Sequence, residues 1–148
     1  IKQKRDAERL ADAFLRNEHA LQLITNCEFE VPAIGMIQGY PFRGKADVLD
    51  SYRVVDLKTT SDLKAFPYAS RKYGYDVQVY IYSELFNKPY EEFKFIAIDK
   101  GSLDIGIYDC SQEFYNSGKE KVTKALETFE TFFINGADLD SYCIKGTL

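Results

Sequence analysis

Residues 44–59 read GKADVLDSYRVVDLKT, in which two apolar segments flank the polar triplet Asp50-Ser51-Tyr52. Short β-rich segments joined by a tight turn are typical of an antiparallel hairpin. The pattern predicts strands over 42–49 and 53–59. A strand over 27–36 and the turn Gln38-Gly39-Tyr40-Pro41 that follows it complete a three-stranded antiparallel meander.

The hairpin carries three charged side chains that are suited to chemistry on phosphate. The two-residue period of a strand places Asp56 and Lys58 on one face, and we expect Asp47 to lie across from Asp56 on that exposed surface. Two neighbouring carboxylates favour a hard divalent cation, Mg²⁺ with Mn²⁺ as a substitute. Such a site supports phosphodiester hydrolysis, with the lysine orienting or deprotonating the attacking water. The alternative is a solvated ion pair on an ordinary hairpin.

The rest of the chain predicts helices at both ends and two further strands. The expected order is αβββαββα, an α/β (α+β) fold with a mixed sheet of about five strands flanked by helices. A helix is expected over 2–23, with a break near Asn17, and a polar connection over 60–74. A second helix over 75–86 has a core stripe of Val77, Ile81 and Leu85. Strands over 93–99 and 103–110 follow, and then a last helix that is capped by Ser111 and ends before Asn135-Gly136. On the first strand, Cys27, Phe29 and Val31 should face the core, opposite Glu28 and Glu30.

Composition restricts the class of protein. The 148 residues favour one domain over 1–148, and the net charge of −4 gives no global attraction to nucleic acid. Cys27, Cys110 and Cys143 lack zinc-ligand spacing and are expected to be reduced thiols. The sequence has no apolar run long enough for a membrane span, so we expect a cytoplasmic protein without membrane contact.

Three motifs in this order resemble the PD-(D/E)xK nuclease superfamily, in its RecB-like and phage recombination exonuclease branch. They are Gly44-Lys45-Ala46-Asp47, then Val54-Val55-Asp56-Leu57-Lys58-Thr59, then Gln78-Val79-Tyr80-Ile81-Tyr82, with His19 matching an upstream helical histidine. Ala46 replaces the proline of the superfamily name, and the second acid is Asp56 rather than Glu.

The resemblance implies a restriction-endonuclease-like core and a role for each matched residue. Asp47, Asp56 and the Leu57 carbonyl would bind metal, Lys58 would be catalytic, and Gln78 with Tyr82 would line the DNA side of the site. The resemblance also makes His19 a third metal-ligating side chain. In a continuous helix His19 shares the inward side with Ala11 and Leu15; Glu18 is the fallback ligand, and a purely structural role is the remaining alternative.

Other residues near the motifs offer weaker signals. Lys64, Arg71 and Lys72 are basic and could contact phosphates, with an ordinary solvated loop as the alternative. Glu28 and Glu30 could support the metal region or form an exposed strand edge. Tyr73 and Tyr75 lie beside the motif helix and are the best candidates among the aromatic residues for stacking on bases.

The expected function is a metal-dependent deoxyribonuclease that degrades linear double-stranded DNA from a free end in phage-type recombination or repair. A recombination protein is an expected partner, and a homo-oligomer is compatible with this mode. The alternatives are an inactive nuclease-fold module that binds DNA or protein, and an endonuclease.

Overall fold

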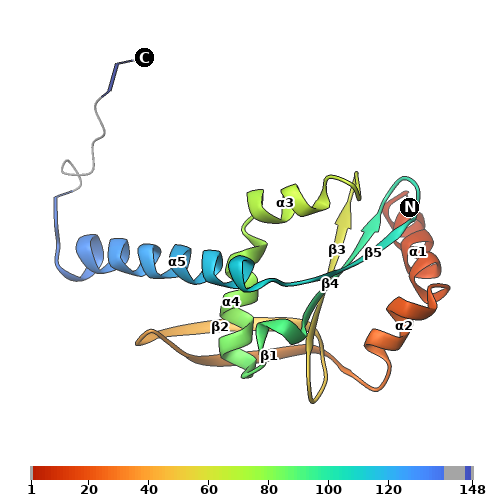
Figure 1. Ribbon diagram of the computed structural model, residues 1–148, viewed down its shortest axis with the longest axis horizontal. Helices are drawn as coiled ribbons and strands as arrows, with labels where there is room; N and C mark the ends of the chain where they lie inside the picture. The colour runs from red at the N-terminus through yellow and green to blue at the C-terminus, as the bar shows by residue number, and fades with distance from the viewer. Residues whose placement is uncertain (1, 139–145, 148) are drawn as a thin grey trace.

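The fold is a five-stranded mixed sheet between two groups of helices (Figure 1). The computed structural model describes residues 2–138 and 146–147. The strands are β1 (Glu28–Ile37), β2 (Tyr40–Leu49), β3 (Val54–Thr60), β4 (Phe93–Asp99) and β5 (Ile105–Asp109), in the spatial order β1-β2-β3-β4-β5. Neighbours are antiparallel except β3 and β4, which are parallel. The predicted meander and mixed sheet are confirmed.

The helices cover opposite faces of this sheet. They are α1 (Lys2–Leu15), α2 (Glu18–Ile24), α3 (Phe66–Lys72), α4 (Tyr75–Phe86) and α5 (Gln112–Phe129), with the short turns η1 (Tyr90–Glu92) and η2 (Glu130–Ile134). The predicted break at Asn17 is confirmed, since its side chain caps α2 by accepting from the Ala20 N–H. Ser111 likewise caps α5 as predicted.

Alternation along β3 divides the core into two layers. Val54 packs with the side chains of α3, α4 and α5, whereas Val55 packs against α1 and α2. Because Asp56 and Lys58 have the same parity as Val54, the strand directs both toward α4. The direction of these two side chains determines which residues surround Asp56 and Lys58.

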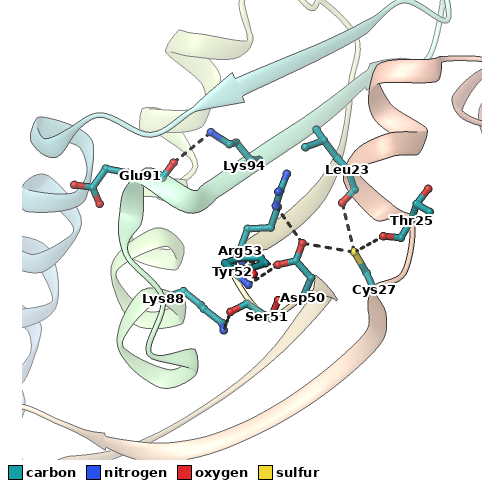
Figure 2. Close-up of polar contacts among 10 residues, drawn as sticks. All are labelled: Leu23, Thr25, Cys27, Asp50, Ser51, Tyr52, Arg53, Lys88, Glu91 and Lys94. Carbon is teal, nitrogen blue, oxygen red and sulfur yellow. Dashed lines mark hydrogen bonds and ion pairs between the residues drawn. The ribbon is translucent and has the colours of Figure 1, made fainter.

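The turn between β2 and β3 is held by Asp50 (Figure 2). Its Oδ1 accepts the N–H groups of Tyr52 and Arg53 at 2.6 and 2.8 Å, and its Oδ2 pairs with Arg53 Nε at 3.1 Å. Lys88 Nζ donates to the Ser51 carbonyl at 2.6 Å, which ties the turn to the end of α4. An aspartate that bonds the backbone two and three residues ahead favours a tight turn. The turn thereby sets the register of β2 against β3.

Residues 60–74 are not the polar connection that we expected, because they contain α3. Asp62 Oδ1 accepts the N–H groups of Lys64 and Ala65, which organises the segment that leads into the helix. Of the α3 side chains, Phe66 and Ser70 are buried. A short helix with so narrow an apolar face gives almost no periodic signal in a polar sequence. With α2 counted separately, the observed order is ααβββααββα.

The predicted stripe of α4 packs against the core, but the burial of this helix extends beyond it. Val77, Ile81 and Leu85 are half-buried, while the fully buried residues are Asp76, Val79, Tyr80 and Ser83. The helix packs against the sheet on one side and against α5 on another, so its buried surface is wider than one stripe.

The start of β1 is more exposed than its alternation suggests. Phe29 is 57% exposed, which contradicts its assignment to the core side, although Val31 on the same side is half-buried. The β1–β2 ladder also lacks the pair between Glu30 and Asp47, and Glu30 has a φ of 55°. Ala46 packs on the α4 side and Val48 on the α2 side, so regular alternation is interrupted around Asp47.

Helices α4 and α5 cross at unusually short range at Gly118. A Cβ atom at Gly118 would overlap the Asp76 carbonyl group, so only glycine fits there. The Asp76 carboxylate is fully buried and accepts from Ser117 Oγ at 2.6 Å and Lys121 Nζ at 2.5 Å. These contacts lower the pKa of Asp76 against the opposing effect of burial. They fix the first turn of α4 to α5.

Within the described residues, no helix is long and apolar enough to cross a membrane. Cys27 and Cys110 are free thiols. Cys143 lies outside the described residues.

Candidate active site

Strands β2 and β3 separate immediately after the turn, and the candidate site lies where they part. They pair only at Val48 with Val55 and at Leu49 with Val54. One step further, where Asp47 comes level with Asp56, the Asp47 Oδ2 atom accepts the Leu57 N–H at 2.9 Å. A side chain here takes the place of a ladder hydrogen bond, so the acid is held against β3.

Asp56 is buried, with 2% of its surface exposed, and this corrects our expectation of an exposed acid. The cause is α4, which covers the face of β3 that carries Asp56. Burial, with a smaller contribution from the nearby Asp47, raises the pKa of Asp56 to about 6 against the opposing effects of Lys58 and Gln78. A buried carboxylate with so altered a pKa destabilises a fold at neutral pH and is characteristic of functional sites.

Lys58 is held by three neighbours from two elements, β3 and α4. Its Nζ lies 2.5 Å from Asp56 Oδ2, donates to Gln78 Oε1 at 3.0 Å, and sits 4.7 Å from the ring centroid of Tyr75. Its side chain is 18% exposed. Surface ion pairs are weak partly because forming them costs side-chain rotamer freedom, and Lys58 is already fixed by its neighbours. The alternative of a solvated ion pair on an ordinary hairpin therefore does not describe Lys58 and Asp56.

Gln78 bridges the acid and the lysine. Its Nε2 donates to Asp56 Oδ1 and its Oε1 accepts from Lys58. Because an amide presents a donor and an acceptor side by side, glutamine satisfies both charged partners at once. The structure therefore brings the three motifs together at Asp47, Asp56, Lys58 and Gln78.

Tyr82 lies one helical turn beyond Gln78 and binds the backbone of β2. Its hydroxyl donates to the Lys45 carbonyl at 3.0 Å. A Cβ atom at Gly44 would lie 2.8 Å from the Tyr82 ring and 3.0 Å from Leu85 Cδ1, so glycine is required for this approach. The contact anchors the strand that carries Asp47 to the helix that carries Gln78.

The donor set fits a hard divalent cation with few protein ligands. Asp56 Oδ2 is buried and, beyond its ion pair with Lys58, has no hydrogen-bond partner among the described residues. Asp47 supplies a second carboxylate nearby. No group of three His, Cys, Asp or Glu side chains that could hold a metal occurs in the described part of the chain. Two carboxylates suit Mg²⁺, which usually keeps several waters and takes further oxygens from substrate phosphate.

His19 is exposed, and the predicted inward face of its helix is wrong. Ala11 is also exposed, and Leu15 is 58% exposed. The break at Asn17 starts a new helix with a different phase, in which Ala20 is the buried residue. The fallback residue Glu18 is exposed as well. A metal-ligating role for His19 stays a prediction that the arrangement of the described residues does not favour.

The basic residues of α3 lie at its C-terminal end. Arg71 and Lys72 are both exposed, with Arg71 Cζ 5.4 Å from the Phe114 ring centroid and Lys72 Nζ 5.7 Å from that of Tyr73. They lie four and three residues before Tyr75, the ring beneath Lys58. Glu30 pairs with Lys45 on the exposed side of the β1–β2 ladder, which agrees with the strand-edge alternative.

Sequence reasoning missed the contacts that support α4. The tie from Asp76 to α5 involves residues 41 and 45 positions away in the chain, which no local pattern reveals. A signal was available at Gly118, because a glycine inside a strongly helical segment often marks a close helix crossing.

Comparisons with known proteins identify the family and agree with the fold. A family model described as "PDDEXK-like domain of unknown function (DUF3799)" matches residues 2–143. The crystal structure of a protein from Eubacterium rectale, described as a "Putative exonuclease", superimposes with a TM-score of 0.74 at 19% identity. The match covers 90% of this chain and 55% of that protein, so the chain spans little more than half of its structural neighbour.

A second structure, that of SSO0001, has a TM-score of 0.45 at 17% identity and covers 82% of this chain and 68% of its own, which is too distant to carry an argument. No curated protein matches the sequence.

Proposed function

We propose, from the premise that the chain belongs to the PDDEXK-like family DUF3799, that it is a metal-dependent deoxyribonuclease. The observation that carries the proposal is the buried Asp56 carboxylate, held by Lys58 and Gln78 and adjacent to Asp47. An inactive binding module would have no need to retain a buried acid, its lysine and a second acid together. The restriction-endonuclease-like fold agrees with this proposal.

Asp47 and Asp56 would hold the cation, with the Leu57 carbonyl as a third oxygen. The N–H and C=O groups of a strand residue point to the same side. Since the Leu57 N–H points at Asp47, its carbonyl is available on that side too. A divalent cation bound there would polarise the phosphate and lower the pKa of the attacking water.

Lys58 would act on the reacting atoms. Its ammonium lies 2.5 Å from Asp56 Oδ2, where it can orient the attacking water or stabilise the negative charge that develops on the phosphate. Gln78 holds both Lys58 and Asp56 through one amide, so it fixes their relative position before substrate arrives. The Tyr75 ring and the buried side chains around Asp56 limit the access of water to Lys58.

The finer parts of the proposal rest on the resemblance of the motifs. We propose Mg²⁺ as the cofactor with Mn²⁺ as a substitute, a free end of double-stranded DNA as the substrate, and a cytoplasmic role in phage-type recombination or repair. A recombination protein or further copies of the chain would be the partners, and Arg71 and Lys72 would contact DNA phosphates. We treat residues 1–148 as one nuclease domain.

The test is to incubate linear and covalently closed circular duplex DNA with Mg²⁺, Mn²⁺ or chelator. We expect shortening of the linear DNA with either metal and resistance of the circle. Nicking of the circle as fast as the linear DNA is shortened would make the protein an endonuclease. Intact DNA under all conditions would instead support the inactive module.

A further inference from the structure

A run of aromatic rings leads from Lys58 to the surface of the molecule. Lys58 Nζ lies over the Tyr75 ring, and the Tyr75 and Tyr73 ring centroids are 6.3 Å apart with an interplanar angle of 35°. Tyr75 is half-buried, and its inner neighbour is the Phe95 ring at 5.7 Å. Tyr73 is 66% exposed, so the run ends in a ring whose surface is open to solvent.

The backbone between the two tyrosines holds this arrangement. Tyr73 is the last residue of α3's capping turn and Tyr75 is the first residue of α4. Gly74 between them has a φ of 72°, a left-handed conformation that glycine adopts without strain. The abrupt change of helix direction places an exposed ring directly beside the ring that covers Lys58.

Positive charge accompanies the exposed ring. Lys72 Nζ lies 5.7 Å from the Tyr73 ring centroid. Aromatic rings flanked by cations are the usual means by which proteins bind unpaired bases, since every base has a face that can stack and a phosphate beside it. The chain as a whole is acidic, so a cation beside an exposed tyrosine is a local feature rather than a consequence of composition.

We propose that Tyr73 is a stacking platform for an unpaired nucleobase of the strand that enters the site. A base within a duplex has both faces covered by its neighbours, so only a single-stranded segment can offer a free face to this ring. The substrate class that follows is single-stranded DNA, or a duplex end whose cut strand has separated. This inference rests on the proposed nuclease function and goes beyond it in naming the form of the strand.

The experiment measures binding separately from cleavage. Two fluorescein-labelled strands of about 12 nucleotides, within the usual site size, are compared: oligothymidine and a strand with the same phosphates but no bases. Anisotropy is recorded with the wild-type chain in Ca²⁺, with strand length checked on a gel. We expect the wild type to bind oligothymidine at least about fivefold more tightly, the low end for one base on one ring.

Variants of two exposed tyrosines, Tyr73 at the C-terminal cap of α3 and Tyr68 within α3, identify the residue responsible for the preference. Tyr73→Ala should abolish the preference for oligothymidine, and Tyr73→Phe should keep it because the ring remains. Tyr68→Ala is the matched control, since Tyr68 is 74% exposed on the same helix but lies about 140° around it from position 73. It should bind both strands as the wild type does.

Two results would overturn the proposal. Equal binding of both strands by the wild type would show that bases contribute nothing, and this outcome requires no variant to fold. Equal weakening of both strands by Tyr73→Ala would show a contact with phosphate or a loss of structure. Cleavage of linear DNA is measured in parallel: a wild type that cleaves but binds both strands equally refutes only the stacking, whereas one that neither binds nor cleaves refutes the nuclease function as well.

Discussion

Replacing Asp56 with Asn should make the free energy of unfolding less sensitive to pH, in a direction set by the burial of this acid. The folded protein raises the pKa of Asp56 from 3.8 to about 6. The folded state therefore retains a proton that the unfolded chain has lost, and the wild type loses stability as pH rises between these values. Asparagine mimics the protonated acid and keeps an oxygen that can accept from Gln78.

The size of the effect follows from the two pKa values. Each pH unit between them is equivalent to about 1.4 kcal/mol, so the stability of Asp56→Asn relative to the wild type should rise by about 3 kcal/mol between pH 3.5 and pH 7. The assay is urea denaturation in chelator across this range, followed by intrinsic fluorescence or circular dichroism. Comparing slopes over pH removes any constant difference between asparagine and a protonated aspartate.

Asp99 supplies a control of opposite sign. Its carboxylate accepts the N–H groups of Gly101, Ser102 and Leu63, and these bonds hold the pKa of Asp99 below its usual value. The wild type gains stability as pH rises toward 4, so the free energy of unfolding of Asp99→Asn relative to the wild type should fall as pH rises toward 4. If Asp56→Asn follows the same trend as Asp99→Asn, or shows no dependence on pH, the account of a buried and destabilising acid is refuted.

Three further substitutions test the supports of the site. Gly44→Ala should cost about 1–3 kcal/mol in urea denaturation through overlap with Tyr82, and less in a Tyr82→Ala background; equal costs in both would contradict the contact. Gly118→Ala should destabilise by a similar amount or more because it meets the Asp76 carbonyl, although alanine normally favours helix; a stabilised variant would contradict the close crossing. Lys58→Met should reduce the rate of DNA cleavage at least about 100-fold with an unchanged circular dichroism spectrum, and retained activity would remove its assigned role.

The local sequence pattern was enough to predict the longer helices and most of the strands. The bounds of α4 and β4 match the predicted 75–86 and 93–99, since both have strong periodicity or β-rich composition and clear stop signals. Helix α3 was not predicted, because its buried residues are Phe66 and Ser70 and the segment around them is polar. Short helices are formed by tertiary packing more than by propensity.

In the candidate site, too, local sequence predicted some features, whereas others depend on distant elements. Spacing alone predicted Asp47 across from Asp56; the observed ladder ends one pair short of them, at Val48 with Val55, and Asp47 Oδ2 accepts the Leu57 N–H instead. The burial of Asp56 depends on α4, which returns to cover β3 from about twenty residues later, so no feature of the strand itself could reveal it. The inward orientation predicted for His19 was wrong for a related reason: the break at Asn17 starts a new helix with a different phase, and helical spacing cannot be counted across a break.

The central claim is that Asp47 and Asp56 form one cation site beside Lys58. The most direct measurement is anomalous diffraction from crystals grown with Mn²⁺, which locates the ion without reference to activity. We expect one strong peak within about 2.0–2.3 Å of a carboxylate oxygen of each acid and of the Leu57 carbonyl. A Mn²⁺ ion bound elsewhere, with both acids unliganded and Lys58 still on Asp56, would contradict the account.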